Sequence, residues 1–379
     1  MVCDRAPARE TTERMRRVAR LTLRRRFGII GAPSAHPLPA GNRRVSSTGP
    51  VARLLAFVLR RILQSFAVMA VVAFIAFGLF NFTGDPVTFM VTQQATMEER
   101  AQLRAALGLD RPYYVQFVRF VGNAAHGEFG VSLRQGRSVS ELLKERLPAT
   151  IELSVAAALI ALVVGIPLGV YTALKRDTWL AHLLLAGSLL GVSLPTFLIG
   201  ILLILIFAVI LGWLPSFGRG QTVAFGWWST GLLTKSGLKS LILPAVTLSL
   251  FQMTLIMRLV RAEMLEVLRT DYIKFARARG LTDRAIHFGH ALKNTLVPVI
   301  TITGLQLGAI IAFAIITETV FQWPGMGLLF IQAVNFADIP VMAAYLCFIA
   351  LVFVLLNLIV DLLYFAVDPR LRVERGTAY

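Results

Sequence analysis

Long apolar runs are the feature that most limits what this chain can fold into. A helix needs about 20 apolar residues to cross the hydrocarbon core of a bilayer. Of the 379 residues, 56% are hydrophobic and only 16% are charged, and the hydrophobic residues gather in runs of that length. This pattern indicates an all-α polytopic membrane protein rather than a globular one. The predicted spans are Leu63–Phe80, Leu153–Leu174, Leu183–Leu211, Leu241–Leu259, Leu296–Val320 and Val341–Val360.

The third run, Leu183–Leu211, is longer than one straight crossing needs. Pro195 could divide it, but each half would be shorter than the ~17 residues that a spanning helix requires. One crossing also keeps the basic segment that follows the fourth span on the cytoplasmic side. We therefore expect a single span here, tilted or kinked at Pro195. The prediction is six transmembrane helices with both termini in the cytoplasm.

The basic residues set the orientation of the predicted spans. Arg60 and Arg61 precede the first span, and Lys175 with Arg176 mark the turn after the second. Basic residues in short loops stay on the cytoplasmic side. The formal net charge of +17 therefore indicates membrane topology and contact with anionic lipid headgroups rather than nucleic-acid binding. The C-terminus returns to the cytoplasm with Arg370, Arg372 and Arg375.

Two segments stand apart from the spans. Residues 1–50 are rich in Arg, Pro, Gly and Ser without a sustained apolar face, which predicts a basic, disordered N-terminal extension. Residues 81–150 have mixed charge and are too polar to span, so we expect a small extracytoplasmic lobe between helices 1 and 2. A short helix there would contain Leu103 and Leu107. Residues 51–379 then form one transmembrane domain.

The basic segment 261–295, between the fourth and fifth spans, is patterned as two short helices. Gly280 stands where a left-handed residue would close the first helix, and Thr282 stands where an N-cap would start the second. Ile286 and Leu292 are among the apolar positions of the second helix. Such a helix–glycine–helix unit is one that a rigid partner could grip, although a solvated basic linker is a simpler alternative. The apolar positions of the first helix recur at helical spacing: Leu265, Leu268, Tyr272 and Phe275.

The 261–295 segment also resembles the cytoplasmic "EAA" loop of permease subunits in bacterial ATP-binding-cassette importers. The resemblance rests on Lys274-Phe-Ala276 followed by Gly280. Only Ala276 remains of the EAA triplet, and His290 and Lys293 replace its usual isoleucine and proline. The form ARARG followed by HALKNTLVP is similar to the peptide/nickel branch of these importers, where such departures are usual.

The resemblance extends over residues 51–372, through the motifs LGLDRPYYVQF and ERLPATIELS. It implies a permease subunit in the bacterial inner membrane that pairs with a second homologous permease. It also implies two cytoplasmic ATPase subunits and an extracytoplasmic substrate-binding protein, for the import of peptides or a related small solute. In that family the loop docks into a groove on the ATPase. The residues that would form this coupling loop are Asp271, Lys274, Ala276, Arg277, Arg279, Gly280, Leu281, Thr282 and Leu292.

The chain lacks the motifs of an energy-converting or catalytic subunit. It has no G-x-x-x-x-G-K-S/T loop, no H-E-x-x-H and no G-x-S-x-G. We therefore predict no catalytic residues, no cofactor and no metal site, with ATP hydrolysed on partner subunits. An ion-coupled secondary transporter is one alternative, but it needs a carboxylate near mid-membrane. A membrane-embedded enzyme would need catalytic side chains in or beside the spans. The ionisable residues of the spans lie near their ends: Glu152, His182, Arg258, Glu318 and Asp361.

Few polar residues remain to line a path. Gln252 on the fourth span and Gln306 on the fifth are the uncharged polar residues nearest mid-membrane. Interhelical hydrogen bonding is the simpler interpretation of both. Gly304 and Gly308 form a G-x-x-x-G pair on the fifth span, which predicts close helix packing, with a partner subunit as one candidate for the opposing helix.

Overall fold

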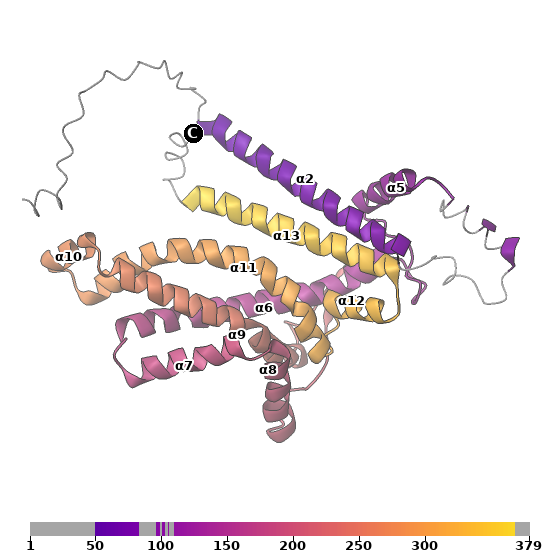
Figure 1. Cartoon of the computed structure of the whole chain (residues 1–379). Coiled ribbons are helices and arrows are strands. Elements are labelled where there is room, and N and C mark those ends of the chain that lie inside the picture. The colour runs from indigo at the N-terminus through magenta and orange to yellow at the C-terminus, as the bar shows by residue number, and fades with distance from the viewer. Residues whose placement is uncertain (1–49, 83–95, 99–100, 103–104, 106–109, 368–379) are drawn as a thin grey trace, which may run out of the picture. The chain divides into compact units, whose positions relative to one another are not determined.

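The computed structural model describes residues 50–82, 96–98, 101–102, 105 and 110–367, and within them helices predominate (Figure 1). In chain order the elements are α2 (Pro50–Phe82), α5 (Tyr113–Ala125), α6 (Val139–Leu174), α7 (Trp179–Ser193), α8 (Thr196–Leu203), the π-helical η1 (Ile204–Ile210), β1 (Val223–Phe225), β2 (Trp228–Thr230), α9 (Lys235–Val267), α10 (Asp271–Ala278), the π-helical η2 (Ala285–Ala291), α11 (Leu292–Val320), α12 (Met326–Asn335) and α13 (Ile339–Val367).

Helices α6 and α9 form the central pair. Glycines on α6 allow the two backbones to approach closely, as small residues do in membrane helix pairs. A Cβ atom added at Gly169 would lie 2.6 Å from Val260 Cβ, and one at Gly165 would lie 3.1 Å from Ile256 Cγ2. Both helices are longer than predicted, with 36 residues in α6 and 33 in α9. In α6 the extra turns are the amphipathic segment SELLKERLP, which continues into the span.

Among the described residues, four helices are long and apolar enough to cross a membrane, and up to six spans result if each of two bent pairs counts as one. The four are within α2, α6, α9 and α13. The first bent pair is α7 with the segment Thr196–Ile210, and the second lies within Ala285–Val320, where the axis turns by 54°. These spans fit a multi-pass membrane protein.

The third run bends at Pro195, where the sequence predicts a tilt or kink of a single span, but the bend is large enough to make α7 and α8 two separate helices. The axis turns by 111° at Leu194 and Pro195. Leu194 is extended, with ψ 138°, and Pro195 precedes α8 with φ −57°. Proline has no N–H to donate and disfavours helical backbone in the residue before it. The helix therefore stops at Ser193, and a new one starts in a different direction (Figure 1).

Helix α12 lies in a stretch for which the sequence analysis predicts no helix. Its residues Met326, Leu329 and Ala333 are buried against Val139 and Leu142 of α6 and Tyr345 of α13. Just before it, the chain buries Phe321 and Trp323, which are 2% and 1% exposed. These contacts join α12 to the ends of α6, α11 and α13.

Helix α2 packs against α13, and α5 packs against α2 (Figure 1). The Phe117 ring of α5 lies edge-on to Phe74 and Phe77 of α2, with ring centroids 5.9 and 5.5 Å away. Part of the predicted lobe, residues 110–138, is thus described and contacts the first span helix. Three predictions lie outside the described residues: the extension up to residue 49, the short helix at Leu103 and Leu107, and the basic C-terminus from Arg370.

Candidate functional site

The 261–295 segment contains three helical pieces rather than the two predicted. They are the last turns of α9, then α10, and then η2, which runs directly into α11. Helix α9 ends at Val267, and α10 begins at Asp271 after an extended Thr270 with φ −68° and ψ 154°. The Thr270 hydroxyl donates to the Val267 carbonyl over 2.6 Å, which satisfies one of the carbonyls left free at a helix end. The predicted single helix from Leu265 to Phe275 is therefore wrong, because the chain breaks between them.

Gly280 closes α10 in the left-handed conformation that the sequence predicts. Its φ is +79°. The Gly280 N–H donates to the Arg277 carbonyl over 2.9 Å, and the Leu281 N–H donates to the Ala276 carbonyl over 3.3 Å. This pair of bonds is the Schellman motif of helix ends. A Cβ atom at Gly280 would meet nothing within 4 Å, so the backbone conformation alone demands glycine.

Thr282 starts the next helix, as predicted. Its hydroxyl accepts from the Ala285 N–H over 3.4 Å, and its carbonyl accepts from the Ile286 N–H over 3.0 Å. Ile286, one turn later, is fully buried, and Leu292 is partly buried against the same cluster. The Gly280 turn and the Thr282 cap therefore reverse the chain within two residues and fix where the second helix begins.

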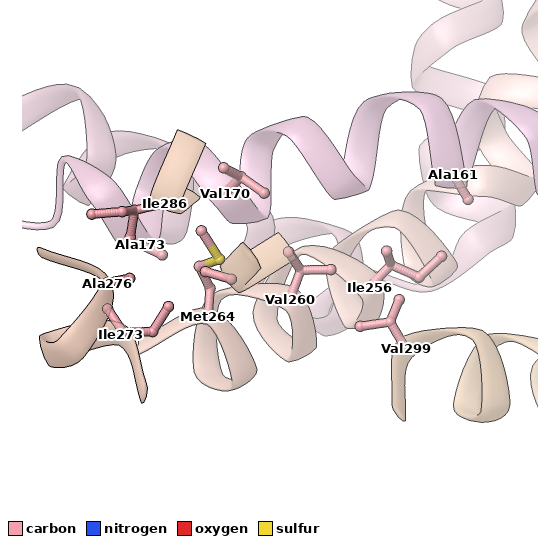
Figure 2. Close-up of a cluster of buried hydrophobic side chains, with 11 residues drawn as sticks. Ala161, Val170, Ala173, Ile256, Val260, Met264, Ile273, Ala276, Ile286 and Val299 are labelled. Atoms are coloured by element: carbon pink, nitrogen blue, oxygen red, sulfur yellow. The ribbon is translucent and has the colours of Figure 1, made fainter. Parts of the chain in front are cut away.

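One face of the segment is locked onto the ends of the two central helices. Ile273 and Ala276 of α10 and Ile286 of η2 pack with Val170 and Ala173 of α6 in a single buried cluster (Figure 2). Met264 and Val260 of α9 complete it. Burying side chains of this size contributes about 1.5–3 kcal/mol each. The segment is consequently held as part of the transmembrane body and is not a solvated linker.

The opposite face is exposed, aromatic and basic. The exposed fractions are 41% for Tyr272, 64% for Phe275 and 52% for Phe288. Tyr272 and Phe275, two of the apolar residues that recur at helical spacing in the sequence, lie on this exposed face, and Ile273 and Ala276 form the buried face. Large exposed aromatics on a folded surface often mark a protein interface.

The charged residues of α10 lie on this same exposed side. Asp271 and Lys274 pair with each other over 2.8 Å, with side chains 95% and 68% exposed. An exposed pair of this kind contributes little to stability. The Arg279 guanidinium lies 5.9 Å from the centre of the Phe275 ring. Arg277, Arg279, Leu281 and Thr282 are all exposed, so they are free to meet another molecule.

The residues suggested for a path are placed differently from one another. Gln252 on α9 is only 3% exposed, and Gln306 on α11 is half-buried. Gln252 therefore packs inside this chain, and a role of either residue in translocation stays a prediction. Gly304 and Gly308 face α13 of the same chain. Added Cβ atoms there would lie 2.8 Å from Val360 Cγ2 and 2.7 Å from Phe353 Cδ2.

A buried ion pair in the N-terminal half of α6 is not predicted from the sequence. Arg219 Nη2 lies 2.6 Å from Glu152 Oε2, and the two side chains are 7% and 4% exposed. Arg219 also donates to the Ser229 carbonyl over 2.6 Å. Ser229 lies in β2, which pairs antiparallel with β1 across a turn at Gly226 and Trp227. The pair thus fastens this hairpin to α6.

Two more buried carboxylates join segments that are far apart in sequence. Glu318 of α11 accepts from the Thr150 hydroxyl over 2.6 Å and from the Leu328 N–H over 3.0 Å. Asp338 accepts from the Ser132 hydroxyl and from the Leu133 N–H, the latter over 3.1 Å. The first ties α6 to α11 and α12, and the second ties the 132–136 turn to the start of α13. No sequence motif announces these links.

Across the part of the chain that the structure describes, no group of three His, Cys, Asp or Glu side chains could hold a metal ion. The buried acidic groups at the ends of the spans are instead bound to hydroxyls, backbone N–H groups and one arginine. These carboxylates therefore link neighbouring elements of the fold to one another.

Comparison with known proteins matches nearly the whole of the described chain. The family described as "Binding-protein-dependent transport system inner membrane component" matches residues 165–373. The N-terminal region of the corresponding membrane component, "Binding-prot-dependent transport system membrane comp, N-term", matches residues 54–154. The two matches lie on either side of residues 155–164 and together include the 261–295 segment.

Three relatives span most of the chain. The dipeptide transport system permease protein DppB of Alkalihalophilus pseudofirmus is 38% identical, over 84% of this chain and 100% of its own length. The di/tripeptide permease DppB of Pseudomonas aeruginosa is also 38% identical, over 85% and 100%. The dipeptide permease DppB of Escherichia coli is 37% identical over the same shares. Among solved structures, a chain of the MetNI methionine ABC transporter is 20% identical, with a TM-score of 0.49 over 60% of this chain and 96% of that one.

Proposed function

This chain belongs to the family of binding-protein-dependent transport system inner membrane components, and on that premise we propose that it is a permease subunit of an ATP-driven importer of dipeptides or related short peptides. Its relatives named as dipeptide permeases match along their full length at 37–38% identity. Because this chain matches those permeases along their full length, we expect it to carry a similar class of cargo.

The observation that carries the proposal is the construction of the 261–295 segment. Its inner face, with Ile273 and Ile286 fully buried, is fixed to α6 and α9. Its outer face presents Phe275 and Arg279 to a partner. A segment whose inner face is fixed to the span helices and whose outer face binds another subunit can transmit movement from that subunit into the spans. We assign the docked subunit to a cytoplasmic ATPase, since this chain has no phosphate-binding loop of its own.

The topology that fits this role has six spans in the bacterial inner membrane, with both termini and the 261–295 segment in the cytoplasm. The two bent pairs then count as one span each. Residues 110–138, the β1–β2 hairpin and α12 face the outside, where a substrate-binding protein would deliver its cargo. A second, homologous permease completes the path, and two ATPase subunits bind below.

An ion-coupled secondary transporter is the competing function, and the buried carboxylates argue against it. Such a transporter needs a carboxylate that can take up and release an ion or proton within the spans. Glu152 is paired with Arg219, and Glu318 is held by Thr150 and the Leu328 N–H. Glu152 holds the β1–β2 hairpin to α6, and Glu318, near the end of α11, holds that helix to α6 and α12. Passage energised by ATP on separate subunits does not need either to change its state.

Uptake by sealed vesicles separates the two functions. The vesicle membrane would contain this chain and the second permease, with the ATPase subunits bound on the inside. The binding protein and a radiolabelled dipeptide would be added outside. We expect uptake only when ATP and the ATPase subunits are present inside. Vesicles that lack the ATPase but have an imposed proton or sodium gradient should accumulate nothing. Gradient-driven uptake without the ATPase would overturn the proposed function.

A further inference from the structure

A cavity of about 520 Å³ lies in the angle between α7 and α8, where α6 and α9 close its back. Leu183 and Leu190 of α7 and Leu202 of α8 stand at its mouth and are 56%, 59% and 41% exposed. Ligand pockets in proteins have volumes of about 300–1,000 Å³. The cavity thus has the size of a small-molecule site and opens on the apolar outer surface of the span helices.

The lining of this cavity is almost entirely apolar, and neither of its two hydroxyl groups has a free hydrogen to donate. Its two hydroxyl-bearing residues are already engaged with backbone carbonyls. Ser188 Oγ donates to the Leu185 carbonyl over 2.7 Å, and Thr254 Oγ1 lies 2.9 Å from the Leu250 carbonyl. A peptide bound here would leave most of its amide and carbonyl groups unpaired, which is unfavourable in an apolar site. The cavity therefore selects against peptide cargo and in favour of a hydrocarbon chain.

The helix that forms one wall points to lipid rather than to another protein subunit. From Thr196 to Ile210 no residue is charged, and the exposed side of the segment is large and aliphatic, including Ile201, Leu205 and Ile210. Its small residue, Gly200, faces inward, where a Cβ atom would lie 3.2 Å from Phe321 and Val320. Membrane helix interfaces favour small residues on the contacting side. The exposed side lacks them and suits acyl chains.

Helix α9 carries a cation one turn beyond its cavity-lining residues. Leu250 and Thr254 of α9 line it, and Arg258 continues the same row by one more turn because residues four apart share a helix face. Arg258 is exposed, and among the described residues it forms no ion pair. Basic groups between span helices attract anionic lipid headgroups. Trp179, at the start of the neighbouring α7, is 75% exposed and suits the headgroup level.

We propose that the α7–α8 angle is a phospholipid-binding site, in which an acyl chain fills the cavity and the lipid phosphate contacts Arg258. The charge-free lining matches the acyl chain, and the unpaired guanidinium matches the phosphate. This site requires only that the chain is embedded in a membrane, so it does not depend on the nature of the cargo. A lipid there would fill the space that the 111° bend leaves between the two helices.

Photolabelling tests the site. The full-length chain, purified with its co-purifying subunits, is reconstituted with a phosphatidylglycerol that carries a diazirine on one acyl chain, then irradiated and digested. We expect the label to concentrate on peptides that contain residues 183–194 and 250–257. Gly187→Leu should remove most of that label, because Gly187 lines the cavity and its added Cβ meets nothing within 4 Å. Arg258→Gln should weaken labelling severalfold at low lipid.

Two control variants, and a crosslinking experiment with the second permease, complete the test. Leu189→Phe adds bulk to an exposed position of α7 outside the cavity, and Lys239→Gln removes an exposed charge at the far end of α9. Both should leave labelling unchanged. Label spread evenly over exposed helices and unaffected by Gly187→Leu would overturn the site. An α7 that crosslinks to the second permease in the assembled complex while the lipid label is absent would overturn it as well. Transport is not the readout, so failure here leaves the proposed function untouched.

Discussion

At the scale of single residues, Gly280 has the strictest backbone requirement in the 261–295 segment. Its φ of +79° costs a residue with a side chain roughly 1 kcal/mol, and a β-branched one more. That energy is small against the stability of the buried spans. It is enough to tilt α10 and the following helix relative to each other, and a docking surface tolerates little misplacement.

We therefore predict that Gly280→Val leaves the amount of inserted permease normal but sharply reduces peptide uptake. Gly289→Val is the matched control. Gly289 lies in the next helix, is exposed, and would place its Cβ in open space without a positive φ. It should retain most of the uptake, since valine in a helix costs well under about 1 kcal/mol relative to alanine. Normal uptake by Gly280→Val at normal expression would mean that the turn is not part of the coupling path.

The pair of Arg219 and Glu152 is the second residue-scale prediction. Removing one partner of a buried pair leaves an uncompensated charge and costs about 3–5 kcal/mol, whereas replacing both by apolar residues costs far less. Arg219→Met should thus lower the thermal stability of the purified chain more than the double variant Glu152→Met with Arg219→Met. In the exposed pair of Arg137 and Glu145, with side chains 51% and 53% exposed, Arg137→Met should change stability by less than about 1 kcal/mol.

Equal destabilisation by the single and double variants would show that the pair is not buried as described. This link was not readable from the sequence because its partners are 67 positions apart, and the ERLPATIELS motif that contains Glu152 does not indicate what this residue contacts. Glu152 is recognisable as an ionisable residue near a span end. Nothing in the neighbouring sequence indicates that Glu152 meets Arg219, which lies between η1 and β1, and the same holds for Glu318 and Thr150.

At the scale of elements, α10 has two faces with separate tasks. Ile273 is fully buried and Phe275, two residues on, is 64% exposed. Deleting buried methyl groups typically costs about 2–5 kcal/mol for Ile→Ala. We expect Ile273→Ala to loosen α10 from α6 and α9, measured as faster proteolysis near residue 279. Phe275→Ala should leave proteolysis unchanged yet reduce ATP-dependent uptake. The reverse pattern would exchange the two faces.

Elements were predictable from the sequence where the signal is local. Apolar run length locates the spans, and Gly280 with Thr282 locates the turn. The sequence does not indicate which face of α10 is buried, because Tyr272 and Phe275 have the size and spacing of core residues whereas Ile273 and Ala276 are the buried ones. Pro195 marks the break in the third run but not its 111° angle, since the angle depends on how α8 packs against α9 and α11. The G-x-x-x-G pair predicts close helix packing but does not indicate that the opposing helix is α13.

At the scale of the whole molecule, the account makes a prediction about sidedness. In a chain with Cys3 and Cys347 replaced by alanine, a cysteine at Gln135 or Thr222 should react with an impermeant maleimide added outside intact cells. A cysteine at Thr282 should react only after the membrane is opened. All three positions are exposed, so burial cannot mask the reaction. Labelling of Thr282 from outside would invert the proposed topology.

The central claim is that force from a separate ATPase enters this chain through the 261–295 segment. Site-directed crosslinking in the assembled transporter tests it most directly. Phe275→Cys, on the exposed face of α10, should form a crosslink to the ATPase subunit with a short bifunctional reagent, and Gln135→Cys should not. The yield at Phe275→Cys should change when ATP is trapped. A fully active transporter in which no exposed position of α10 crosslinks to the ATPase would contradict the account.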